Sequence, residues 1–159
     1  MPARLICAVL VAICAIFTAA APHAQTARDL HAPFDRVLDT YVRDGYVYYR
    51  ALKSERDVLD RYIQSLDVPA AQVSAWSHDE QLAFWLNAYD ALVLRAVIDA
   101  YPIKAVTTEY PAKSIRQIPG AFERVSHRVA GQSLTLDAIE QSKILALGDA
   151  RAVVAIGRG

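Results

Sequence analysis

The longest apolar pattern in the chain lies between residues 77 and 100, and it predicts the central helix of the fold. Ser77 followed by Glu80 forms a capping box, in which the hydroxyl and the carboxylate each satisfy a free backbone N–H group. Between Leu82 and Ile98 the strongly polar residues are Asn87, Asp90 and Arg95. A helix that is apolar on nearly every side is buried on most sides. We therefore expect a buried central helix over about 78–100.

Shorter patterns precede this helix. Residues 25–33 are expected to be a linker. Apolar residues at helical spacing predict a helix that begins at Phe34 and is ended by Gly45, and a second helix over 52–66. Alternation and three tyrosines predict a short strand over Tyr46–Arg50. A short helical turn is expected between Pro69 and Trp76.

The C-terminal half has a mixed pattern. Residues 103–121 are punctuated by proline and glycine and are expected to be irregular. A strand is predicted over 122–129, with a short return at 133–134. Thr135 should cap a helix that ends at Gly148, and Arg151–Ile156 is expected to be a buried strand. Together these elements predict a single α+β domain that is mostly helical, with a small sheet in its C-terminal half.

The N-terminus has the features of a secretory signal peptide. Met1–Arg4 are positively charged, and Leu5–Ala21 contain no charge. Small residues follow, with Ala24 as the expected cleavage position. Residues 1–24 are therefore predicted to direct export to the periplasm or the medium, leaving no stable membrane span. An uncleaved membrane anchor is the alternative, although the apolar stretch is short for a span of ~18 residues or more.

The leader contains both cysteines of the chain, Cys7 and Cys14. Isoleucine precedes each of them, whereas a lipid-attachment cysteine normally follows a small residue. The mature domain is thus expected to have no disulfide and no thiol nucleophile. We assign residues 34–159 to one domain. Gly159 follows the last predicted strand directly, and a strand of this kind normally leads into more structure, so a C-terminal truncation is one interpretation.

Composition excludes several classes of function. The chain has 17 basic and 17 acidic residues and no basic block, which argues against a general nucleic-acid binder. His31, His78 and His127 are widely separated and form no zinc-binding pair, so we predict no metal site and no cofactor. The chain also lacks a Gly-x-Ser-x-Gly motif, and an α/β-hydrolase triad is therefore unsupported.

Asn87 and Asp90 are the main candidates for a site. They are three residues apart and lie at neighbouring positions of one helix face. A buried polar group without a partner costs about 1–3 kcal/mol, so a polar notch that binds a ligand would explain them. In the alternative, Asn87 bonds a loop and Asp90 faces water or an arginine. His78 and Asp79 are expected to be solvated capping residues, and His127 to lie on an exposed strand edge.

Several segments together resemble a known family. Residues 84–90, Phe-Trp-Leu-Asn-Ala-Tyr-Asp, are similar to the Phe-Trp-x-Asn-x-Tyr-Asn segment of the domain of unknown function 547 family. Residues 45–49, 136–140 and 149–151 resemble other segments of that family, in the same order. The resemblance extends over about residues 34–156. It implies an exported bacterial domain without an established activity.

The resemblance also implies which polar positions recur: Asn87, Tyr89, Asp90 and Glu140. Asp90 departs from the pattern, because asparagine is usual there. Members often have a histidine near the position of Val153 and a cysteine near that of Gly157. If relatives use such a pair for chemistry, this chain is an inactive relative, uses other groups or lacks a downstream part of its site.

Two functional hypotheses follow. The first is a binding or scaffold module of the cell envelope, with an unknown ligand or protein partner and with Asn87, Tyr89 and Asp90 as binding residues. The second is a hydrolase-like enzyme in which Glu140 is the general acid or base and His127 assists. The second requires Asn87, Asp90 and Glu140 to converge on one site.

Overall fold

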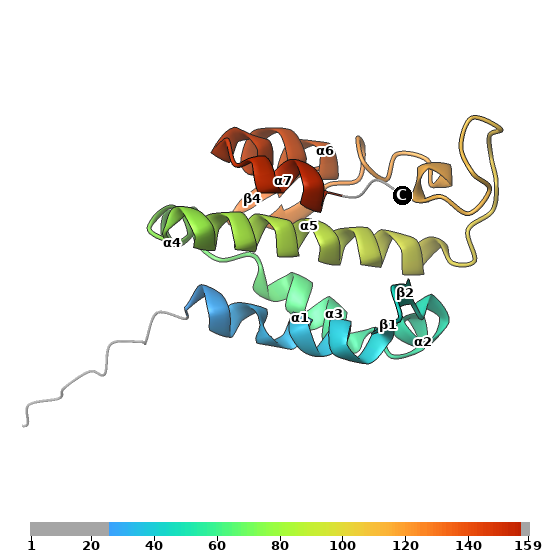
Figure 1. Cartoon of the computed structure of the whole chain (residues 1–159), viewed down its shortest axis with the longest axis horizontal. Helices are drawn as coiled ribbons and strands as arrows, with labels where there is room; N and C mark the ends of the chain where they lie inside the picture. Colours follow the sequence, from blue (N-terminus) through green and yellow to red (C-terminus); the bar gives the residue numbers. More distant parts are fainter. Residues whose placement is uncertain (1–25, 157–159) are drawn as a thin grey trace, which may run out of the picture.

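The structure, a computed structural model, describes residues 26–156. The predicted leader, residues 1–24, lies outside this range, as does Gly157. The long helix α5 (His78–Ala100) runs between a layer of N-terminal helices and the C-terminal elements (Figure 1). Ser77 and Glu80 form the predicted capping box. The mostly helical α+β fold class is confirmed. None of the helices within residues 26–156 is both long enough and apolar enough to cross a membrane.

The N-terminal layer begins earlier than expected. Helix α1 (Ala27–Tyr41) includes residues 27–33, which the sequence analysis assigned to a linker. Thr26 caps the helix by accepting from the Asp29 N–H, and the buried Leu30 lies one turn before the buried Phe34. The cap and the buried face explain why this segment is helical, even though Pro33 lies inside it.

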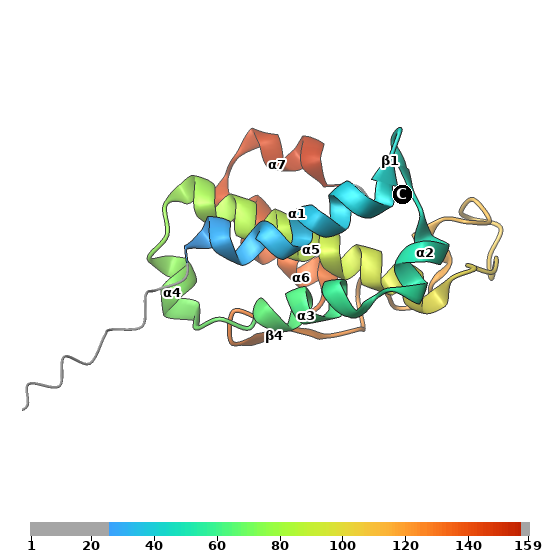
Figure 2. The same ribbon diagram turned by 90° about the horizontal axis from the view of Figure 1, so that it is seen from below.

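Two short helices complete this layer, α2 (Tyr49–Ser54) and α3 (Asp57–Ser65), and a third, α4 (Ala70–Ser74), lies at the start of α5 (Figure 1). The single helix predicted over 52–66 is therefore two helices, and Glu55 and Arg56 separate them. Seen from below, α1 lies along α5 with α3 beside it (Figure 2).

Two antiparallel hairpins are present within residues 26–156. Strand β1 (Val42–Arg43) pairs with β2 (Tyr46–Val47), and β3 (His127–Val129) pairs with β4 (Gln132–Leu134). The second hairpin confirms the small sheet of the C-terminal half, although its first strand is shorter than the predicted 122–129. Its turn contains Ala130 and Gly131, both at positive φ.

The helix after Thr135 has three consecutive parts. They are α6 (Leu136–Ile139), the π-helical turn η2 (Glu140–Ile144) and the 3₁₀ turn η3 (Leu145–Leu147). Thr135 caps the first part by accepting from the Ala138 N–H, and Gly148 ends the last in the left-handed conformation. Both predicted ends of this helical segment are therefore confirmed.

The prediction of a buried strand over Arg151–Ile156 is wrong. This segment forms helix α7 (Ala150–Ala155), whose first turn is capped by the Asp149 carboxylate accepting from the Arg151 N–H. Val153 and Val154 are 69% and 89% exposed, so these β-branched residues do not fill a core strand. The local cap outweighs their strand propensity.

Two faces of α5 join the layers into one core. Phe84 lies against Trp76 and His31 on the side of the N-terminal helices, with ring centroids 5.3 and 5.9 Å apart. Tyr89 is fully buried and contacts Glu140 of the C-terminal segment. The helix is therefore buried on most of its sides, as its apolar sequence predicts.

Candidate functional site

A cleft of about 490 Å³ lies between α3, the C-terminal half of α5 and the segment before β3. Its volume falls within the range of small-molecule sites, about 300–1,000 Å³. The cleft is lined by Arg56, Asp60, Gln64, Arg95, Ala96, Asp99, Ala100, Ile118, Ala121, Val125 and His127. Charged groups of α3 and α5 and the imidazole of His127 thus meet one apolar wall, and we take this cleft as the candidate site.

Arg95 and His127 form the central polar contact of the cleft. Arg95 Nη2 lies 2.8 Å from His127 Nδ1. A guanidinium has no acceptor, so Nδ1 accepts this hydrogen bond and the imidazole is neutral, with its proton on Nε2. Burial first, and the positive charge of Arg95 second, lower the pKa of His127 to about 4.

His127 is not on an exposed strand edge, as the sequence analysis expected; it is only 6% exposed. The residues of β3 alternate between buried and exposed positions, and the backbone N–H of Ala130 bonds the Leu66 carbonyl at 2.9 Å. This contact holds the hairpin against the end of α3. His127 Nε2 is buried without a hydrogen-bond partner.

The second arginine of the cleft has a different environment. Arg56 Nε lies 2.6 Å from Asp60, and its Nη1 lies 2.7 Å from Asp99. Two carboxylates therefore balance its charge. Across residues 26–156, by contrast, no carboxylate lies within ion-pair distance of Arg95.

The predicted residues Asn87 and Asp90 lie elsewhere on α5. An α-helix turns by about 100° per residue, so Asn87 lies about 200° around the axis from Tyr89. Asn87 is half-buried. More than a third of the Asp90 surface is exposed, while desolvation by the surrounding protein raises its pKa to about 6.

Tyr89 and Glu140 are brought together by the fold. The Tyr89 hydroxyl donates to Glu140 Oε2 at 3.4 Å, and both residues are buried. Glu140 begins the π-helical turn η2, and the Gln141 amide lies 3.2 Å from its other oxygen. The four residues named by the resemblance therefore divide into a Tyr89–Glu140 contact and two residues at other positions around α5. None of the four lines the cleft.

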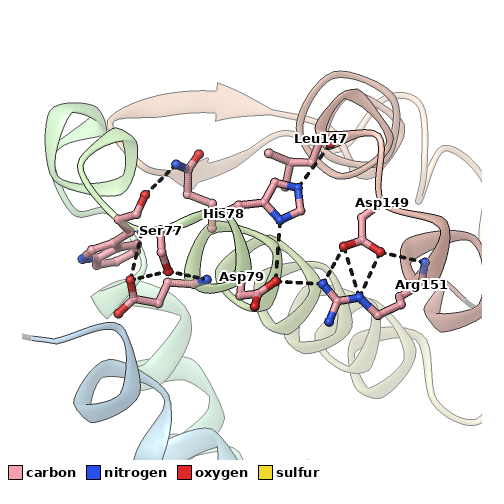
Figure 3. Close-up of polar contacts among 9 residues, drawn as sticks. Ser77, His78, Asp79, Leu147, Asp149 and Arg151 are labelled. Carbon is pink, nitrogen blue, oxygen red and sulfur yellow. Dashed lines mark hydrogen bonds and ion pairs between the residues drawn. The ribbon is translucent and has the colours of Figure 1, made fainter.

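A separate polar network joins the end of η3 and the start of α7 to the start of α5 (Figure 3). Arg151 Nη2 lies 2.8 Å from Asp79 and 2.6 Å from Asp149. His78 Nε2 lies 3.3 Å from the Leu147 carbonyl, and its Nδ1 lies 3.6 Å from Asp79. Hydrogen bonds from Arg151 lower the pKa of Asp149 to about 2.

Three groups of this network have the spacing of a cation site. The ligand atoms of His78, Asp79 and Asp149 lie within 4.8 Å of one another. However, the Arg151 guanidinium already lies between the two carboxylates (Figure 3). The network therefore holds α7 against the start of α5. The sequence analysis expected only solvated capping at His78 and Asp79, because Asp149 and Arg151 are about 70 residues away in the chain.

A buried pair between α1 and α3 was also missed. His31 Nδ1 lies 2.7 Å from the Tyr62 hydroxyl, and His31 Nε2 is buried without a partner. Burial lowers the pKa of His31 and raises that of Tyr62. The misassigned linker concealed this pair, because His31 was not expected to belong to a helix.

A family model described as "Protein of unknown function, DUF547" matches residues 73–152. The chain belongs to this family. The DUF547 match runs from α4 into α7 and includes Arg95 and His127, whereas Arg56 lies outside it. The resemblance of residues 45–49 also falls outside the matched range. Neither the curated proteins nor the solved structures gave a significant match.

Proposed function

We propose that this DUF547 domain is exported to the periplasm or the medium and acts there as a ligand-binding module of the cell envelope. The cleft of about 490 Å³ is the observation that supports the binding role. It combines charged groups with an apolar wall, the composition that small-molecule sites commonly have. The predicted signal peptide over residues 1–24 supports export.

The geometry gives less support to the hydrolase-like alternative. That mechanism needs Glu140 and the Asn87–Asp90 pair around one substrate. Glu140 contacts Tyr89, and the helix places Asn87 on the opposite side from Tyr89. His127 lines a cleft that contains neither Glu140 nor Asn87. A binding role requires no such convergence.

A fragment titration followed by NMR tests the binding role. We expect fragments from a panel of anionic, cationic and neutral compounds to shift amide signals of Ala96, Ala100 and His127 together. Gln64→Trp, at the exposed rim of the cleft, should abolish these shifts. Arg61→Trp, on the same helix but outside the cleft lining, should leave them intact. Fragments that shift residues outside the cleft, or none at all, would refute the proposal.

Expression of the whole chain in a bacterium tests export. The exported protein should have the mass of a chain that begins after about Ala24. Val11→Arg places a charge in the apolar stretch and should retain the full-length chain in the cells. Retention of the unchanged sequence at full mass in the cytoplasm would contradict the proposal.

A further inference from the structure

Arg95 lines the cleft, and no carboxylate of residues 26–156 lies within ion-pair distance of its guanidinium. Its observed partner, His127 Nδ1, is neutral and uses one of the five N–H donors of the guanidinium. The remaining N–H donors and the positive charge can therefore bind a ligand in the cleft. Arginine binds planar carboxylates through two parallel hydrogen bonds, which makes a carboxylate a suitable partner.

The rest of the lining favours a ligand with an apolar body. Ala96 and Ala100 lie on α5, and Ile118, Ala121 and Val125 come from the segment before β3. Their side chains offer no hydrogen bond. A ligand that lies against them gains by removing apolar surface from water, at about 25 cal/mol per Å².

The charges of the cleft favour one negative charge on the ligand rather than two. Asp60 and Asp99 both line the cleft and balance Arg56. Because they repel further negative charge, a dianion such as phosphate is disfavoured relative to a monoanion. We infer that the cleft binds a small organic monocarboxylate, with its carboxylate on Arg95 and its apolar body against the Ala96–Ile118 wall.

This inference rests on the proposed binding role and names the class of ligand. It also assigns a positioning role to His127. The imidazole accepts from Arg95 Nη2 and thereby fixes the plane of the guanidinium within the cleft. A fixed guanidinium loses less conformational freedom when it binds a carboxylate.

The test compares hexanoate, hexanamide and inorganic phosphate in NMR titrations at pH 7. Hexanoate should shift the cleft signals with the lowest Kd, since its uncharged amide lacks the ion pair. Arg95→Gln should weaken hexanoate binding about tenfold to a hundredfold. Arg128→Gln provides the matched control and should not change the Kd, because Arg128 lies on the same hairpin but pairs with Asp67 outside the cleft lining.

The His127 variants separate positioning from a merely structural role. His127→Gln retains an acceptor for Arg95 and should bind hexanoate with little change, whereas His127→Leu should bind it severalfold more weakly. Equal weakening in both variants would contradict the positioning role. Arg95→Lys keeps the charge and provides a second test if Arg95→Gln does not fold. The Arg95→Lys variant should bind hexanoate more weakly than the original chain does. It should still bind hexanoate more tightly than it binds hexanamide.

Failure of the inference can be distinguished from failure of the proposed function. If hexanamide or phosphate binds the cleft as tightly as hexanoate, or if Arg95→Gln leaves the hexanoate Kd unchanged, the inference is wrong and the binding role stands. The inference is also wrong, and the binding role stands, if other fragments bind the cleft and hexanoate does not. If no compound of the fragment panel reaches the cleft, the proposed function itself fails.

Discussion

A polar network lies at each end of α5, and each network contains an arginine. The partners of these two arginines differ. At the N-terminal end the exposed Arg151 lies between Asp79 and Asp149. Towards the C-terminal end the half-buried Arg95 bonds the neutral imidazole of His127. A guanidinium between two carboxylates has its charge balanced within the protein. A guanidinium that bonds a neutral acceptor keeps a positive charge that can attract a ligand.

This difference separates a structural contact from a candidate site. The Arg151 network is exposed to solvent, and exposed ion pairs add little to stability. It still joins α7 to α5, because Arg151 of α7 pairs with Asp79 in the first turn of α5. Arg95 lies in a cleft with an apolar wall, where a charge interacts more strongly than in bulk water.

The pH dependence of stability should be largest at His127. The unfolded chain protonates this imidazole near pH 6.5, while the folded protein resists protonation until about pH 4. The unfolded state therefore binds more protons in this window, and the free energy of unfolding falls as the pH drops from about 6.5 to 4. The loss assigned to His127 is roughly 3 kcal/mol.

Urea titrations across this pH range compare the original chain with His127→Gln, which cannot titrate. The difference between their free energies of unfolding should change through the window and level off below about pH 4. His31→Gln provides a comparison with the other buried histidine. A difference that does not depend on pH would contradict the assignment.

Removing Arg95 should have the next largest effect on the folded protein. Arg95→Met leaves His127 Nδ1 buried without its donor, which costs about 1–3 kcal/mol. It also removes the positive charge that helps to lower the pKa of the imidazole. NMR titration of the ring signals should show this pKa rising above about 4. An unchanged pKa would mean that burial alone sets it.

Arg151→Gln should have a smaller effect on global stability, confined to the other end of α5. The pKa of Asp149 should rise from about 2 towards its ordinary value, because its hydrogen bonds to the guanidinium are lost. Amides of α7 should exchange faster, while those of Arg95 and His127 stay unchanged. Hydrogen exchange measured residue by residue checks this. Faster exchange at the cleft would show that the two ends are coupled.

Asp90→Asn should have the smallest effect, an increase in stability. Because the folded protein raises the pKa of this carboxyl, ionising it costs more in the folded than in the unfolded state. That penalty grows as the pH rises from about 4 to about 6 and stays constant above. Thermal unfolding at pH 7 should therefore give a higher Tm for Asp90→Asn, with no gain at pH 3. A lower Tm at pH 7 would indicate that the charge has a stabilising partner.

Local signals made the fold readable where they were strong. The Ser77–Glu80 capping box and the apolar pattern after it fixed α5, and Thr135 and Gly148 fixed the ends of the last long helical segment. The prediction failed where two local patterns in one segment favoured different structures. Val153 and Val154 favour a strand, but the Asp149 cap makes their segment helical.

The candidate site was harder to read, because tertiary packing creates it. Arg95 and His127 are 32 residues apart, and nothing in either segment predicts their contact. The sequence emphasised Asn87 and Asp90 because they interrupt an apolar helix, yet they lie away from the cleft. The family resemblance identified Tyr89 and Glu140, which do meet. Their binding or catalytic roles stay predictions.

The available charge of Arg95 is tested most directly by observing the guanidinium itself. NMR of the arginine side-chain nitrogens during a hexanoate titration follows Arg95 and Arg56 in the same sample. We expect a saturable shift at Arg95 and at the His127 ring, with little change at Arg56, whose charge Asp60 and Asp99 balance. A shift at Arg56 with none at Arg95 would contradict it.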